Sequence, residues 1–206
     1  MRVIEIEQSP HYEDRKFFSY DYLVFDEGVT ALVGCNGAGK STIIENIKRH
    51  CKKNNIDCVQ FDNLQDGASQ TKLKAGVYGD YTTMASLMSC SEGEGIKIAF
   101  GEFVKSLRDF VRKHTGKKEK WILIDAIDSG LSIDNILEVK DFFDFLLQDK
   151  NPDIKVYIVV SSNAYEVANG EACINVRTGK HIRFKDYEEY KQTILKTAEQ
   201  RNESNY

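Results

Sequence analysis

The chain has 206 residues, of which 41% are hydrophobic and 29% are charged, and its net charge is −4. This length and balance allow one domain with a full hydrophobic core and exclude an intrinsically disordered chain. The small negative charge gives no overall attraction to nucleic acid or to an anionic membrane, and no apolar run approaches the ~20 residues of a membrane-spanning helix.

Strand and helix signals alternate along the chain. Runs rich in β-branched and aromatic residues predict strands at Val3–Ile6, Phe17–Phe25, Val29–Val33, Ile56–Phe61, Trp121–Ile124, Val156–Val160, Cys173–Val176 and His181–Phe184. Helix signals predict helices at Ser41–Lys53, Asp80–Met88, Ile96–Val111, Asn135–Leu147 and Asp186–Ala198.

Two of the predicted strands, Trp121–Ile124 and Val156–Val160, are apolar throughout, as are central strands that helices cover on both faces. The sequence therefore predicts an α/β fold with a mostly parallel central sheet and helices on both faces. The β-rich segment Met1–Val33 predicts an added antiparallel β layer. We expect a single domain over residues 1–198 and a flexible C-terminal tail over residues 199–206.

The five cysteines are an odd number and include no C-x-x-C pair, so neither a disulfide framework nor a zinc site is predicted. The first residues, Met1–Gln8, alternate like a strand and do not resemble a signal peptide. We expect a cytoplasmic protein that is not bound to a membrane.

The clearest motif is Gly34–Ser41, whose sequence Gly-Cys-Asn-Gly-Ala-Gly-Lys-Ser matches the P-loop pattern between a predicted strand and a predicted helix. Glycines let backbone N–H groups surround phosphates, and the N-terminus of the helix adds a positive pole. Lys40 would neutralise the β- and γ-phosphates, and the Ser41 hydroxyl would bind Mg²⁺. The predicted ATP-binding residues here are Gly34, Asn36, Gly37, Ala38, Gly39, Lys40, Ser41 and Thr42.

A second candidate is Asp125, which ends the apolar strand Trp121–Ile124. Ligands of open α/β sheets bind at the carboxyl ends of the strands, so Asp125 is predicted to hold Mg²⁺ through water. A turn-forming aspartate after a strand would look the same, and it is the P-loop earlier in the chain that favours the functional interpretation.

A third motif, Ser91-Glu92-Gly93-Glu94, precedes the predicted helix at Ile96–Val111. A capping box has the same pattern. However, the order of P-loop, this tetrapeptide, Asp125 and Ser129-Gly130-Leu131-Ser132 resembles that of soluble ABC-type ATPases such as the SMC and RecF proteins, over the range Val29–Asn163.

This resemblance implies a P-loop NTPase fold of the ABC type and an ATPase head that hydrolyses ATP to ADP and phosphate. SMC heads carry a long coiled coil, but the segment between Lys40 and Cys90 is too short to hold one. In that family two heads form a homodimer around two ATP molecules, so Ser91, Gly93 and Glu94 would bind the nucleotide held by the partner's P-loop. A glutamine after the strand Ile56–Phe61 would reach Mg²⁺ together with Ser41 and Asp125. Gln65 is our choice for that glutamine over Gln60 and Gln70.

The chain departs from the family at two catalytic positions. The glutamate that activates water follows the strand aspartate in the family, but Ala126 stands there, and loss of a general base costs about 10²- to 10⁴-fold in rate. Either a deliberate Glu-to-Ala substitution or a natural slow switch would explain Ala126. Asp128 offers a carboxylate two residues farther along, in a position that fits less well.

At the second position the family has a histidine, and Asn163 or Ser162 stands there instead. Asn163 is the catalytic candidate, because its amide can bond a γ-phosphate although it cannot titrate. For adenine the candidates are Tyr12, Arg15 and Phe17, and none is preferred.

Three hypotheses follow. The first is an ATP-dependent dimerisation switch that acts on a partner protein or on DNA, with hydrolysis impaired by Ala126. The second is an ATP sensor that does not hydrolyse ATP and serves a separate effector. The third, less favoured, is a small P-loop kinase, for which no arginine-rich lid is found between Leu131 and Ser162.

Overall fold

The computed structural model describes residues 1–7, 18–62, 92–113, 115–128 and 131–203. The strands are β1 (Arg2–Glu5), β2 (Tyr22–Phe25), β3 (Gly28–Val33), β4 (Asp57–Asp62), β5 (Glu119–Asp125), β6 (Lys155–Ser161), β7 (Ala172–Asn175) and β8 (His181–Ile182). The helices are α1 (Lys40–Lys53), α5 (Glu92–Arg112), α6 (Ile133–Asp149), α7 (Tyr165–Ala168) and α8 (Tyr187–Glu203).

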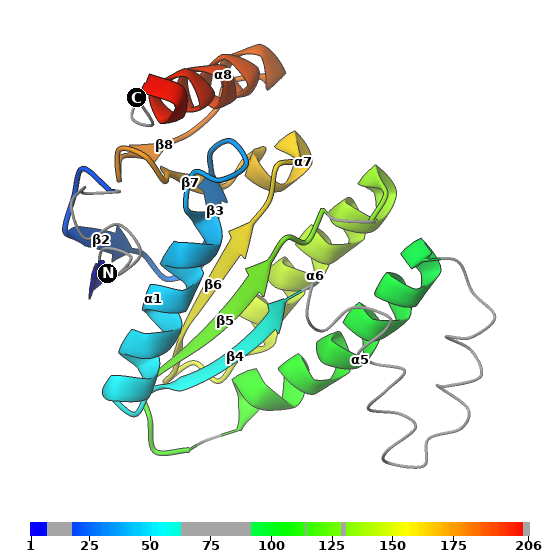
Figure 1. Cartoon of the computed structure of the whole chain (residues 1–206). Helices are drawn as coiled ribbons and strands as arrows, with labels where there is room; N and C mark the ends of the chain where they lie inside the picture. The colour runs from blue at the N-terminus through cyan, green and yellow to red at the C-terminus, as the bar shows by residue number, and fades with distance from the viewer. Residues whose placement is uncertain (8–17, 63–91, 114, 129–130, 204–206) are drawn as a thin grey trace.

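The described strands form a six-stranded sheet in the order β4-β5-β6-β3-β7-β8 and a separate two-stranded sheet of β1 and β2. Every pair in the large sheet is parallel except β7 with β8, and β1 pairs with β2 antiparallel (Figure 1). The predicted α/β class with a mostly parallel sheet is confirmed. The antiparallel β1–β2 pair is likewise present, although β2 is shorter than the predicted strand.

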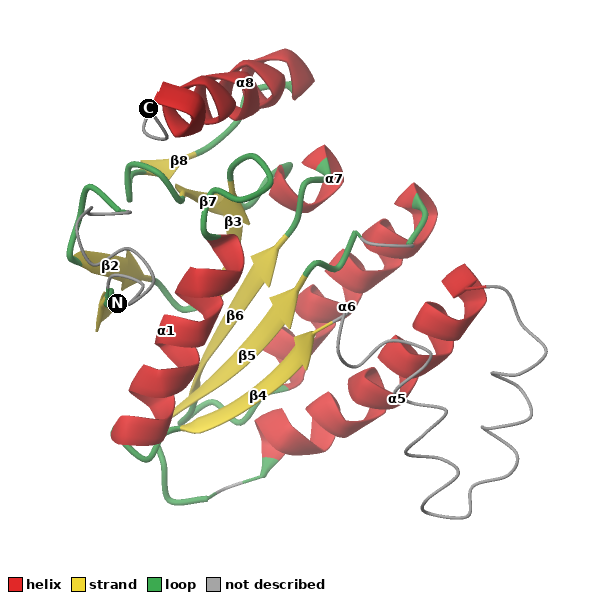
Figure 2. Ribbon diagram, viewed as in Figure 1, coloured by secondary structure: helices red, strands yellow, loops and turns green. Residues whose placement is uncertain are grey.

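Helices cover both faces of the sheet, with α1 on one face and α5 and α6 on the other (Figure 2). Successive side chains of a strand point to opposite faces, and β5 shows the consequence. Its residues Trp121 and Leu123 pack in the hydrophobic cluster on the α1 side, whereas Ile122 and Ile124 pack with α5 and α6. All of β5 is buried, both its apolar centre Trp121–Ile124 and the charged residues Glu119, Lys120 and Asp125 on either side.

Several elements differ from their predicted bounds. Helix α8 continues past Ala198, where we expected a flexible tail, and ends at Glu203. The short helix α7 was not predicted. The helix expected at Asp80–Met88 lies outside the described residues. No helix in the described ranges combines the length and the apolar character needed to cross a membrane.

Candidate functional site

The predicted P-loop connects β3 to α1 at the carboxyl edge of the sheet. Gly37 and Gly39 have φ angles of 75° and 101°, which are left-handed values that glycine adopts without strain. At Gly34 a Cβ atom would lie 2.7 Å from Val176 Cγ2, so only glycine fits against that side chain. The backbone conformation and the packing of the loop therefore explain why the motif has glycine at these positions.

Lys40 is the first residue of α1, and its side-chain amine lies over the loop. The Nζ atom donates hydrogen bonds to Gly34 O at 2.7 Å, to Cys35 O at 3.2 Å and to Asn163 Oδ1 at 2.8 Å. Burial lowers the pKa of the Lys40 amine, and the negative charge of Asp128 is the largest effect that opposes this shift. The amine therefore lies over the loop, between two of its backbone carbonyls and the Asn163 side chain.

The strand β6 lies between β3 and β5, and the residues that follow it separate the P-loop from Asp125. Of the two candidates at the position of the family histidine, Asn163 is exposed and contacts Lys40. Ser162 is buried, and its Oγ accepts a hydrogen bond from the backbone N–H of Ala164 at 2.9 Å. The structure thus places Asn163, and not Ser162, beside the lysine.

Asp125 ends β5 and is buried. Its Oδ1 atom accepts a hydrogen bond from the Ser161 hydroxyl on β6, and the same hydroxyl accepts one from the backbone N–H of Ala126 at 3.0 Å. Sequence analysis missed Ser161, because a serine at the end of a strand carries no signal of its own. Ser161 therefore links the end of β6 to the end of β5 by hydrogen bonds.

The chain turns sharply after Asp125. Ala126 has a φ of 54°, a left-handed conformation that costs a residue with a Cβ about 1–2 kcal/mol. Ile127 then packs in the core, and Asp128 returns to the edge of the sheet, where its Oδ2 accepts a hydrogen bond from the Asn163 backbone N–H at 3.1 Å. The turn thus brings the Asp128 carboxylate next to the backbone of Asn163.

Helix α8 contacts the P-loop from the C-terminal end of the chain. Thr197 is buried, and its Oγ1 accepts a hydrogen bond from the backbone N–H of Cys35 at 3.1 Å. Arg201 donates from Nη1 to Asn36 O at 2.6 Å. Both residues were missed in the sequence, because nothing in the pattern of α8 indicates that the helix folds back onto the loop.

The described residues leave several predicted site residues unplaced. Ser91, Gln65, Gln70 and the adenine candidates Tyr12, Arg15 and Phe17 lie outside them. Gly93 and Glu94 belong to α5, which begins well away from the P-loop beyond the β4 edge of the sheet (Figure 1). Gln60 lies within β4. Ser41 and Thr42 stand in the first turn of α1, next to Lys40.

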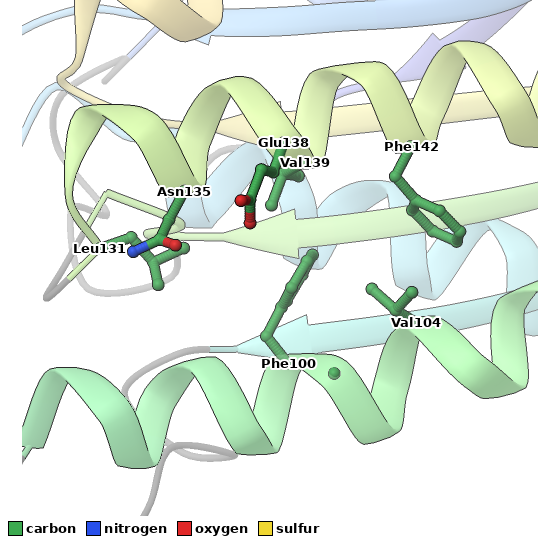
Figure 3. Close-up of a pocket in the computed structure, with 8 residues that line it drawn as sticks. Phe100, Val104, Leu131, Asn135, Glu138, Val139 and Phe142 are labelled. Carbon is green, nitrogen blue, oxygen red and sulfur yellow. The ribbon is translucent and has the colours of Figure 1, made fainter.

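A separate cavity of about 240 Å³ opens between α5 and α6 (Figure 3). Its lining is mostly apolar and consists of Phe100, Gly101, Val104, Leu131, Asn135, Glu138, Val139 and Phe142. The cavity lies on the face of the sheet opposite α1 and shares no described residue with the site around Lys40.

No protein-family model matches the chain, and no curated protein matches it.

Proposed function

We propose that the chain binds ATP through Gly34–Ser41 and works as an ABC-type ATPase that dimerises on ATP. The observation that supports this best is the position of the Lys40 amine. It lies at the N-terminus of α1, above two loop carbonyls and next to Asn163, on the edge of the sheet where Asp125 also ends its strand. A cation, a helix N-terminus and a carboxylate at one edge suit a triphosphate with its metal.

The residues at the site fit Mg²⁺ that arrives with the nucleotide. Ser41 supplies a hydroxyl and Asp125 a carboxylate, and Mg²⁺ bound to a nucleotide takes its other ligands from phosphates and water. When bound, the metal would neutralise charge on the phosphates.

We infer the dimer from the family pattern. Ser91, Gly93 and Glu94 would complete the site of a second copy, and the remote start of α5 agrees with action on a partner's nucleotide. ATP would thus close two heads, and hydrolysis would release them, as a switch for a partner protein or DNA.

A second candidate function is an ATP sensor without hydrolysis. It is favoured by the methyl group of Ala126, which cannot activate water. The kinase hypothesis is weakened by the positions of Arg108 and Arg112. Both pair with Asp149 near the C-terminal end of α5, where the helix leads into the amino end of β5 and so lies far from the P-loop.

Sedimentation of the chain with ATP and Mg²⁺, with ADP and without nucleotide tests the switch. We expect dimers with ATP alone, and we expect Ser91→Arg to remain a monomer while it still binds ATP. Ser106→Arg, an exposed substitution of the same kind on α5, is the control and should dimerise. Binding of ATP without a dimer at any protein concentration would rule out the switch.

A further inference from the structure

We infer that Asp128 supplies the carboxylate that activates water for ATP hydrolysis, in place of the glutamate that Ala126 replaces. The inference rests on the proposed ATP binding at Gly34–Ser41 and assigns a residue to the reaction. It changes the expectation that Ala126 impairs hydrolysis.

The backbone turn after β5 brings Asp128 to the site. With φ at 54°, Ala126 ends the extended path of β5, and its methyl group cannot take part in proton transfer. The turn is fixed to β6 by two hydrogen bonds, from Ala126 N–H to Ser161 Oγ at 3.0 Å and from Ile127 N–H to Ser161 O at 3.4 Å. Asp128 therefore has a defined position beside the end of β6.

One carboxylate oxygen of Asp128 is oriented by the protein. Its Oδ2 accepts the Asn163 backbone N–H at 3.1 Å, and the side chain of the same asparagine accepts the Lys40 amine at 2.8 Å. The Asn163 carbonyl in turn accepts the Tyr190 hydroxyl at 2.7 Å, so α8 also holds this residue. Asn163 thus joins the phosphate-binding lysine to the carboxylate.

The other carboxylate oxygen has no donor in the part of the chain that the structure describes. Asp128 Oδ1 is buried and has no hydrogen-bond partner there. The nearby Lys40 amine does not serve it, since an ammonium group has three donors and those of Lys40 bond Gly34, Cys35 and Asn163. A water molecule that donates to Oδ1 would fill this unmet hydrogen bond and would lie within the reach that a general base needs.

In the proposed hydrolysis of ATP, each bond that forms is matched by a bond that breaks. The oxygen of a water molecule attacks the γ-phosphorus, and the water's proton passes to Asp128 Oδ1. The bond from the γ-phosphorus to the oxygen that bridges to the β-phosphate breaks, and ADP leaves with the electron pair. The proton on Asp128 is lost to solvent after phosphate departs.

The test compares the wild-type chain, Asp128→Asn, Ala126→Glu and the control Asp144→Asn, which changes an exposed carboxylate on α6. Three quantities are measured: ATP affinity by calorimetry, phosphate release, and the lifetime of the ATP-dependent dimer by sedimentation. We expect Asp128→Asn to bind ATP within a few-fold of wild type, to lose about 10²- to 10⁴-fold in turnover and to remain a dimer long after the wild type has dissociated. Asp144→Asn should behave as wild type, and Ala126→Glu should change turnover by less than 10-fold.

Two results would overturn the inference and leave ATP binding intact. One is a wild-type chain that binds ATP but releases no phosphate. The other is an Asp128→Asn variant that turns over at the wild-type rate, particularly if Ala126→Glu raises that rate by 10²-fold or more. Absence of ATP binding by the folded wild-type chain would instead overturn the proposed function itself. Circular dichroism of each variant shows whether the substitution has left the fold intact.

Discussion

Two neighbouring loops at the carboxyl edge of the sheet are built in opposite ways. The P-loop after β3 turns on Gly37 and Gly39, which adopt left-handed φ angles without strain, and α8 supports it from outside. The turn after β5 makes its left-handed step at Ala126, which has a Cβ, and Ser161 of the adjacent strand holds it. The first loop has the residues that its conformation prefers, and the second is held in its conformation by a neighbour.

The difference between the two loops shows which part of a site can be recognised in a sequence. A loop whose shape follows from its own residues has a motif, because those residues must recur in fixed order. A loop whose shape depends on a residue elsewhere in the chain has no such motif. Strain of this kind persists only where the surrounding structure enforces it, and it is concentrated at functional sites.

The largest change in the free energy of unfolding is expected from Gly34→Ala in the P-loop. The new Cβ would meet Val176 Cγ2 at 2.7 Å and Ala38 Cβ at 3.1 Å, so we expect a loss of about 3 kcal/mol in the free energy of unfolding, the upper end of overpacking costs. Gly101→Ala is the matched control, because nothing lies within 4 Å of its added Cβ, and it should stabilise α5 by about 0.5–1 kcal/mol. Urea unfolding measures both. Equal effects would mean that the P-loop is not closely packed against Val176.

A smaller effect is expected from Thr197→Val, which tests the support that α8 gives to the P-loop. The buried N–H of Cys35 loses its acceptor, which should lower the free energy of unfolding by about 2 kcal/mol. Thr193→Val one turn earlier removes a hydroxyl that donates to Glu189 O, and it should cost well under half as much. We expect ATP affinity to fall with Thr197→Val alone. If the two variants unfold at the same urea concentration, α8 does not stabilise the loop.

The smallest effect, and one of opposite sign, is expected from Ala126→Gly. Glycine adopts a φ of 54° without the Cβ penalty, and part of this gain is offset by its greater freedom in the unfolded chain, so we expect a net stabilisation of about 0.5 kcal/mol. Ala172→Gly is the control, since Ala172 lies in the strand β7, where the greater freedom of glycine in the unfolded chain should destabilise the protein. A destabilising Ala126→Gly would show that the turn is not strained.

Much of the architecture could be predicted from residue patterns alone. The apolar centres of β5 and β6 indicated a parallel sheet covered on both faces, and the spacing around Phe100 and Leu107 indicated α5. The Gly34–Ser41 motif could be placed between a strand and a helix because its residues are contiguous in the chain. The contacts of Asp128, Ser161 and Arg201 could not, since each depends on chain segments that meet only in the folded protein.

Binding of ATP by Gly34–Ser41 is tested most directly by calorimetric titration with ATP and Mg²⁺. Three proteins are compared: the wild-type chain, Lys40→Ala and Lys48→Ala. Lys48 is an exposed lysine on the same helix and serves as the matched control. We predict that the wild type and Lys48→Ala bind ATP equally, and that Lys40→Ala binds about 10- to 100-fold more weakly, because it loses hydrogen bonds from a charged donor worth about 1.5–3 kcal/mol. Wild-type protein that does not bind ATP, or Lys40→Ala that binds as tightly as wild type, would contradict the assignment of Gly34–Ser41 as an ATP-binding loop.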